Sequence, residues 1–133
     1  MMAIKYLTVH CSDSPNNREV AAAEIHRWHQ EKKFDGIGYH AVIRRDGTIE
    51  KGRPLYWHGA HVRRYNRVSL GVCLIGKDEF TDEQLRSLEL LLQEWLDLYP
   101  SAKVVGHRDL DPKKTCPNFD VSAWCKETGI INA

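Results

Sequence analysis

Residues 4–10, with the sequence Ile-Lys-Tyr-Leu-Thr-Val-His, decide the fold. Most of these residues are apolar or β-branched, and they follow one another without a polar residue at every second position. A half-exposed strand alternates apolar and polar residues, whereas a strand covered on both faces is apolar almost throughout. Residues 4–10 therefore predict an interior strand of a sheet that has helices on both faces, and His10 ends this strand.

Two further stretches have the same character. Residues 70–76 and 102–106 are short and almost wholly apolar, which predicts two more buried, central strands. The second of these stretches is followed directly by His107. Two predicted central strands therefore end at a histidine.

Helical spacing is found between the predicted strands. Ala21, Ile25 and Trp28 recur at i, i+4 and i+7, which predicts an amphipathic helix that ends at about Lys33. Residues 81–84, Thr-Asp-Glu-Gln, have the pattern of a capping box and begin a second helix. The apolar stripe of this second helix is predicted to consist of Leu85, Leu88, Leu92 and Trp95. A short helix is predicted at residues 121–128.

The order of these elements predicts the fold class. Asp46-Gly47 separates residues 39–45 from residues 48–51 and indicates a β-hairpin, because this dipeptide favours a tight turn between strands. Strands that alternate with helices of this size are typical of an α/β fold. The sequence therefore predicts a single α/β domain over residues 1–133, in which a mixed central β-sheet is flanked by α-helices.

The composition limits the classes of protein that remain. Of the 133 residues 42% are hydrophobic and 28% are charged, as in a domain that folds without a partner, so we expect a monomer. The 19 Lys and Arg residues nearly balance the 18 Asp and Glu residues, which excludes a general affinity for nucleic acid. No apolar run approaches the roughly 20 residues of a membrane span, and residues 1–10 lack the apolar core of a signal peptide. We therefore expect synthesis in the cytoplasm and no membrane anchor.

The four cysteines are expected to be free thiols, because no export signal is visible. Cys73 lies in an apolar strand and Cys125 in a predicted helix, so both are expected in the core. Cys116 lies in the loop 107–117, which is rich in Pro, Lys and Asp and where no core is expected. A chemical role is therefore the better explanation for Cys116.

His10, His107 and Cys116 are candidates for one shared site. Strand ends are where α/β domains build their sites, and two imidazoles with one thiolate suit a catalytic Zn²⁺. The chain has no His-Glu-x-x-His and no Cys-x-x-Cys motif. The spacing alone therefore does not distinguish a zinc site from histidines whose side chains only form hydrogen bonds at the ends of strands. A hydrolase with Cys116 as nucleophile and His107 as base is a third interpretation, although it leaves His10 without a role.

The chain also carries a colinear series of short motifs between Ile4 and about Trp124. They are residues 4–12 (IKYLTVHCS), 25–29 (IHRWH), 38–43 (GYHAVI), 45–48 (RDGT), 66–76 (NRVSLGVCLIG), 106–109 (GHRD) and 114–120 (KTCPNFD). In this order they resemble the zinc-dependent N-acetylmuramoyl-L-alanine amidases, a family that includes bacteriophage amidase-type lysozymes and animal peptidoglycan recognition proteins. The order and the short loops resemble the phage amidases most closely.

The resemblance implies an activity and a set of site residues. The implied activity is zinc-dependent hydrolysis of the amide bond between N-acetylmuramic acid and L-alanine in peptidoglycan, as in the endolysins that lyse bacterial cell walls. The implied zinc ligands are His10, His107 and Cys116. The implied catalytic residues are Tyr39, which orients the attacking water or shuttles its proton, and Lys114, which stabilises the tetrahedral oxyanion.

A pair of lysines precedes Cys116. The spacing between His107 and Cys116 is one residue longer than in some phage members of the family, so Lys113 competes with Lys114 for the catalytic role. Pro117 fixes the backbone next to Cys116, and the extra residue is accommodated more easily within residues 110–113. We therefore assign the role to Lys114.

A surface groove is expected for a substrate as long and polar as peptidoglycan. The irregular segment 52–69 contains the residues that we expect to line this groove, namely His61, Arg63, Arg64 and Asn66. The expected partner is peptidoglycan or a soluble muropeptide, and an enzyme without a signal peptide reaches the cell wall only through a permeabilised membrane.

The resemblance also leaves two other functions open. Binding modules of the recognition-protein type keep the fold and the groove but lack the cysteine ligand, so Cys116 argues against this alternative. Some phage amidases also bind and inhibit an RNA polymerase. For this chain such a partner is predicted by family analogy only.

Overall fold

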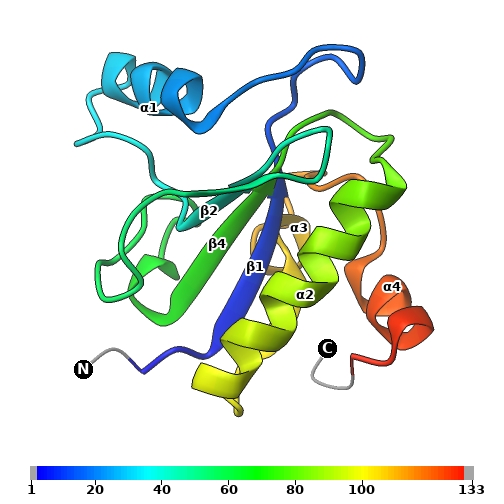
Figure 1. Ribbon diagram of the computed structural model, residues 1–133. Coiled ribbons are helices and arrows are strands. Elements are labelled where there is room, and N and C mark those ends of the chain that lie inside the picture. The colour runs from blue at the N-terminus through cyan, green and yellow to red at the C-terminus, as the bar shows by residue number, and fades with distance from the viewer. Residues whose placement is uncertain (1–2, 131–133) are drawn as a thin grey trace.

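Helices and strands alternate along the chain in the computed structural model, which describes residues 3–130. The strands are β1 (Tyr6–Cys11), β2 (Ala41–Ile43), β3 (Ile49–Lys51), β4 (Ser69–Leu74) and β5 (Lys103–Gly106). The helices are α1 (Ala22–Glu31), α2 (Asp82–Leu98), α3 (His107–Leu110) and α4 (Val121–Thr128), with a 3-10 turn at Asn66–Val68. In Figure 1, α2 lies across the near face of the sheet and α4 lies beside it. The predicted α/β class with a mixed sheet is confirmed.

The sheet has the strand order β3-β2-β4-β1-β5. β2, β4, β1 and β5 run parallel to their neighbours, and only β3 is antiparallel to β2. β1 is an interior strand, as residues 4–10 predicted. The prediction that residues 102–106 form a central strand is wrong, because β5 lies at the sheet edge. An apolar run indicates that both faces of a strand are covered, but it does not indicate that both edges pair with other strands. Val104 of β5, for example, is buried because β5 packs against α4.

The two faces of β1 serve different purposes. Leu7 and Val9 point toward α2 and belong to a large apolar core that also includes residues of β4, β5 and α4. Thr8 and His10 point to the opposite face, since successive side chains of a strand alternate. On that face α1 covers only the neighbouring strands, through Ile25 and a smaller apolar cluster. The polar side chains of β1 therefore lie beside α1 rather than beneath it.

The two long helices begin and pack mostly as predicted. The capping box of α2 is present: Gln84 N donates to Thr81 Oγ1, and Thr81 N donates to Gln84 Oε1, both at 3.0 Å. Leu88, Leu92 and Trp95 are buried in the core, whereas Leu85 is only partly buried. α1 ends at Glu31, slightly before the predicted end, and both Ile25 and His29 are buried.

The predicted hairpin is present but its first strand is shorter than expected. Gly47 N donates to Arg44 O at 2.8 Å, and Gly47 has a φ of 90°, which is a conformation that glycine adopts readily. β2 covers residues 41–43 only, so Tyr39 precedes the strand that it was expected to begin. Tyr39 O instead accepts from Arg53 N at 2.9 Å, which ties Tyr39 to the segment that follows β3.

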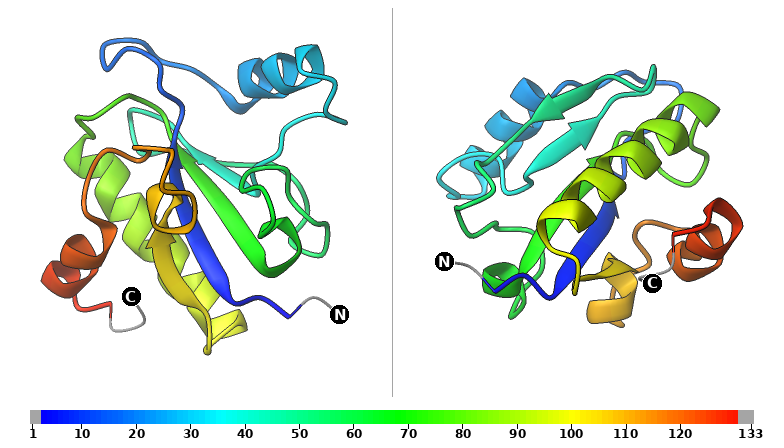
Figure 2. Two further views of the ribbon diagram at one scale, coloured as in Figure 1. Left: turned by 180° about the vertical axis from the view of Figure 1, so that it is seen from behind. Right: turned by 60° about the horizontal axis from the view of Figure 1, so that its bottom comes forward.

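The carboxyl ends of β1 and β5 lie next to each other, because these strands are parallel neighbours. Figure 2 (left) shows the sheet from the side away from α2, with α3 on one side of β1 and the segment between β3 and β4 beyond β4. The residues that follow β1 and β5 therefore meet at one end of the sheet. Among residues 3–130, no helix is both long enough and apolar enough to cross a membrane.

Candidate metal centre and active-site cleft

Three of the predicted site residues meet at the carboxyl ends of β1 and β5. The candidate ligand atoms of His10, His107 and Cys116 all lie within 4.8 Å of one another. The imidazole rings of His10 and His107 are 4.4 Å apart between centroids. Residues that are about a hundred positions apart in the sequence are therefore brought together by the pairing of β1 with β5.

Backbone hydrogen bonds hold Cys116 against β1. Cys11 N donates to Cys116 Sγ at 2.9 Å, and Arg108 N donates to Cys116 O at 2.8 Å. Asn118 Nδ2 donates to Lys77 O at 2.6 Å and so fastens the chain just after Cys116 to the segment that follows β4. The loop predicted after His107 also begins with one helical turn, α3, whose Asp109 carboxylate accepts from Gly106 N at 2.8 Å. The position of Cys116 is therefore fixed from both sides.

The protonation states at this site suit a metal ion. Burial, followed by the charges of His61 and His107, lowers the pKa of His10 well below its usual value. Burial also lowers the pKa of His107, and the nearby Lys114 ammonium acts in the same direction although Asp111 opposes it. Both imidazoles are therefore neutral at pH 7 and offer lone pairs. A hydrogen bond with Cys11, together with burial, raises the pKa of the Cys116 thiol, so a metal bound here displaces a proton.

The donor set fits zinc by its chemistry. Two imidazole nitrogens and one sulfur are ligands that Zn²⁺ prefers, and three protein ligands leave a fourth position for water or substrate. His10 is 1% exposed, whereas the side chains of His107 and Cys116 are partly exposed. The site is therefore closed on the side of β1 and open on the side of the loop.

A cleft of about 880 Å³ opens in front of the three side chains. It is lined by the three candidate ligands and by residues from α1, the segments around Tyr39 and His61, and the loop after α3. Tyr39 is one of the lining residues, and its ring is 5.0 Å from that of His10 between centroids. Burial raises the pKa of the Tyr39 phenol well above its usual range, so this hydroxyl keeps its proton at pH 7 and can donate a hydrogen bond.

Both lysines of the loop line the cleft and have exposed side chains. They differ in their relation to the candidate ligands. The charge of Lys114 acts on the pKa of His107, whereas Lys113 is not among the groups that shift it. Of the two lysines, Lys114 is therefore the one whose charge acts on a candidate ligand.

The predicted groove residues do not share one role. His61, Arg63 and Asn66 line the cleft, whereas Arg64 does not. Asn66 Oδ1 accepts from His61 N and from Val62 N, both at 2.8 Å, so this oxygen shapes the backbone of the segment. The ring of His61 is bonded on both nitrogens within the protein. Arg63 is the member of this set that both lines the cleft and has an exposed side chain.

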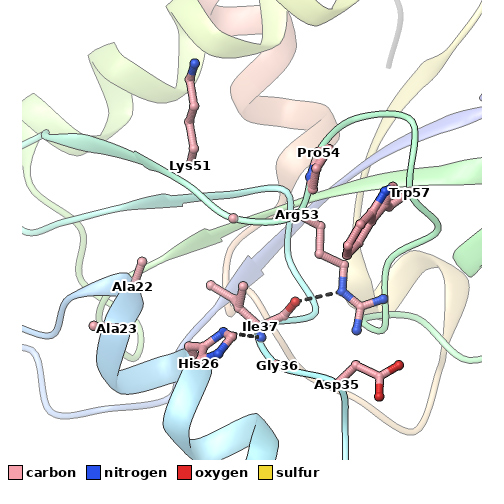
Figure 3. A pocket seen from close by; sticks show the side chains of 11 residues that line it. Ala22, Ala23, His26, Asp35, Gly36, Ile37, Lys51, Arg53, Pro54 and Trp57 are labelled. Atoms are coloured by element: carbon pink, nitrogen blue, oxygen red, sulfur yellow. Dashed lines mark hydrogen bonds between the residues drawn. The ribbon is translucent and has the colours of Figure 1, made fainter.

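A second hollow of about 470 Å³ lies between the beginning of α1 and the segment after β3 (Figure 3). The guanidinium of Arg53 forms part of its wall and is held there by the carbonyl oxygens of Ile37 and His58, each at 2.7 Å. His26 Nδ1 accepts from Ile37 N at 3.0 Å on the opposite wall. None of the predicted catalytic or ligand residues lines this hollow, so it is separate from the candidate site.

Sequence analysis missed the structural roles of two buried histidines, His29, which lines the cleft, and His40, which does not. His29 Nδ1 accepts from Gly38 N at 2.8 Å, and His40 Nδ1 accepts from Gly71 N at 3.1 Å. His40 Nε2 faces Trp57 O at 2.9 Å, which requires a proton on that nitrogen. A helical spacing of four from Ile25 identifies His29 as a residue of the buried face. No such spacing identifies His40.

Comparison with known proteins agrees with this geometry. A family model described as N-acetylmuramoyl-L-alanine amidase matches residues 1–119. The endolysin of Enterobacteria phage K11 is 40% identical over 133 residues, which span 94% of this chain and 87% of that protein. The solved amidase LysC from Clostridium intestinale superposes with a TM-score of 0.87 at 26% identity and covers 97% of this chain and 87% of its own. A variant of Drosophila PGRP-LB in complex with tracheal cytotoxin has a TM-score of 0.80 at 25% identity, over 95% of this chain and 82% of that chain.

The fold and the cleft are those of enzymes that cleave an amide bond in peptidoglycan. The chain belongs to the N-acetylmuramoyl-L-alanine amidase family. Within this family it is similar to phage endolysins over most of its length, and it hydrolyses the bond between N-acetylmuramic acid and L-alanine in peptidoglycan. The predicted enzyme class is therefore confirmed.

Proposed function

We propose that the amidase depends on zinc and that His10, His107 and Cys116 are its ligands. The observation that carries this proposal is the meeting of three candidate ligand atoms within 4.8 Å of one another in the lining of the cleft. A zinc ion in such a site polarises a carbonyl group and lowers the pKa of water to near 7. The side chains around it then have to bind the substrate, donate hydrogen bonds and stabilise charge.

Lys114 and Tyr39 are the residues that we assign to these tasks. Lys114 carries an ammonium group on the open side of the cleft, where it stabilises the negative charge that develops on the oxygen of the scissile amide. Tyr39 keeps its hydroxyl proton, because burial raises the pKa of its phenol, and so it donates a hydrogen bond to the attacking water or to the substrate. This role for Tyr39 is orientation rather than proton abstraction.

The cleft fits a muropeptide or a strand of peptidoglycan. Its loop side carries Lys113 and Lys114, and Arg63 lies on another part of its lining, so the cleft attracts the carboxylates of a stem peptide. The solved relative with tracheal cytotoxin supports this assignment. We propose that the enzyme acts on the cell wall after the cell membrane has been permeabilised, in the manner that the phage endolysins suggest by similarity.

A binding module with the same fold is the competing function. The presence of Cys116 beside two histidines favours catalysis, because a module that only binds needs no third ligand. A cysteine nucleophile is disfavoured because burial and the hydrogen bond with Cys11 raise the pKa of Cys116, whereas a nucleophilic cysteine needs a lowered pKa.

Metal analysis combined with a cell-wall hydrolysis assay tests the proposal. We expect about one zinc ion per chain, loss of hydrolysis after treatment with a strong chelator, and recovery when zinc is added back. Full hydrolysis by metal-free protein would contradict it. Because the thiol must lose its proton and both imidazoles must stay neutral, zinc affinity should also fall as the pH is lowered.

A further inference from the structure

His61 lies behind His10 on the closed side of the site. His61 Nδ1 and His10 Nε2 are 2.8 Å apart, and the two rings meet at an angle of 79°. The other nitrogen of His61, Nε2, is 3.2 Å from the backbone carbonyl oxygen of Ser69 in β4. Three groups therefore form one chain of hydrogen bonds that runs from the backbone of β4 to His10.

The direction of each hydrogen bond in this chain follows from the group at its end. Ser69 O is a carbonyl oxygen and can only accept, so Nε2 of His61 carries a proton. A neutral imidazole carries one proton, so with that proton on Nε2 the Nδ1 of His61 has a lone pair. That lone pair accepts a proton from Nε2 of His10. With its single proton on Nε2, the imidazole of His10 has a lone pair on its remaining nitrogen, Nδ1.

The structure around His61 holds its ring in this position. A Cβ atom on Gly71 would lie 2.6 Å from Nδ1 of His61, and one on Gly59 would meet Cδ2 of the same ring. Two glycines therefore leave the space that the ring occupies between β4 and the preceding segment. Asn66 Oδ1 accepts from the backbone N–H of His61 and so fixes the main chain from which the ring extends.

We propose that His61 is a positioning residue that fixes the tautomer of His10 and thereby assigns Nδ1 of His10 as the metal-binding atom. This inference rests on the proposed zinc site and deepens it. His61 contacts neither the metal nor the scissile bond in this role: it holds a ligand in place, as outer hydrogen-bond partners of metal-binding histidines do. The earlier expectation that His61 binds substrate is thereby replaced by a role inside the protein.

Nitrogen-15 NMR of the imidazole rings in the intact wild-type protein tests the tautomers directly. With zinc bound, we expect a proton on Nε2 of His10 and on Nε2 of His61, and zinc on Nδ1 of His10. A proton on Nδ1 of either ring would overturn the proposal. This measurement needs no variant, so it decides the question even where a substitution at His61 prevents folding.

Zinc affinity, measured by competition with a chelator, tests the contribution of His61. His61→Phe keeps an aromatic ring but removes both nitrogens, and we expect zinc affinity to fall by about 10- to 100-fold. His61→Asn places an acceptor oxygen near the position of Nδ1 and should recover most of that loss. His58→Phe, at an exposed histidine of the same segment, is the matched control and should bind zinc as the wild type does. Equal zinc affinity of folded His61→Phe and wild type would overturn the proposal.

The two proposals fail in different ways. If the wild-type protein binds no zinc, the proposed metal centre is wrong. If it binds zinc through Nε2 of His10, the metal centre stands and only the role of His61 is wrong.

Discussion

The two walls of the cleft are built by different means. The wall beside β1 contains the side chains of His10 and His61, which bond to each other, and His61 also bonds to a backbone oxygen of β4. The wall formed by the loop after β5 is held by its backbone, through Arg108 N and Cys116 O, and leaves Lys113 and Lys114 exposed. The first wall is fixed by hydrogen bonds of its side chains, whereas the second presents exposed positive charge. The proposed metal centre lies between these two walls.

Cys116 is the point where the two walls meet, so its loss should have the largest effect. We expect Cys116→Ala to lose most of its zinc and nearly all hydrolysis, because only two ligands remain. Cys116→Asp is the matched control and should keep part of both, since a carboxylate also binds zinc. Zinc content and cell-wall hydrolysis measure the outcome. Wild-type hydrolysis by Cys116→Ala would show that this residue is neither a ligand nor a nucleophile.

The second prediction separates two neighbouring charges on the loop wall. Removing one group that stabilises an oxyanion typically lowers the rate by ~10²–10³. We expect Lys114→Ala to lose activity on that scale while it keeps its zinc, and Lys113→Ala to lose far less. Turnover and metal content of both variants test this. A strongly impaired Lys113→Ala beside an active Lys114→Ala would reverse the assignment.

The third prediction concerns the contribution of His29, a residue of the cleft lining, to stability. Burial, with the charges of Lys32, Arg53 and His26, lowers the pKa of His29 from 6.5 to about 4. Below pH 6.5 the unfolded chain therefore binds a proton that the folded chain does not, so the free energy of unfolding falls as the pH falls toward 4. At about pH 5 the lowered pKa of His29 reduces the free energy of unfolding by on the order of 2 kcal/mol.

His29→Asn tests this pH dependence, because its Oδ1 replaces the acceptor for Gly38 N but does not titrate. Urea unfolding at about pH 7 and at about pH 5 should show that the variant loses less stability than the wild type, by roughly 2 kcal/mol. The exposed His58→Asn should behave as the wild type. An unchanged pH dependence in His29→Asn would remove His29 as its cause.

The smallest effect is expected at the rim of the cleft. Arg63 lines the cleft and is exposed, so a charged contact there contributes at most about 1 kcal/mol. Arg63→Ala should raise KM for peptidoglycan by up to about fivefold with kcat unchanged, whereas Arg64→Ala should leave both unchanged. Steady-state kinetics of the two variants test this. An effect of Arg64 equal to that of Arg63 would show that the rim extends beyond the described cleft.

The sequence predicted those features that depend on local pattern. Apolar runs located β1, β4 and β5, and the capping box located the beginning of α2. The two strand-end histidines were expected at one place, and the structure brings them together with Cys116. Features that depend on which strands become neighbours were less accessible. The edge position of β5 is an example. β5 packs against α4, so its sequence is as apolar as that of an interior strand.

The roles of the histidines were the least predictable feature. His61 was assigned to the substrate groove, and its bond to His10 arises from a contact across 51 positions of sequence. His40 also supports its surroundings, because its Nδ1 accepts a hydrogen bond from Gly71 N in β4. No local pattern distinguishes an imidazole that binds a ligand from one that supports a neighbour. An interaction with RNA polymerase and a monomeric state stay predictions.

The parallel pairing of β1 has a consequence for the order in which the protein forms during synthesis. β1 is made before its two neighbours, β4 and β5, which begin at Ser69 and Lys103. Parallel pairs between distant segments form late in folding because long loops must close first. His10 thus emerges from the ribosome long before either strand that will flank it, and Cys116 follows only after all five strands have been made. A nascent chain therefore cannot bring the three candidate ligands together until residue 116 has been made.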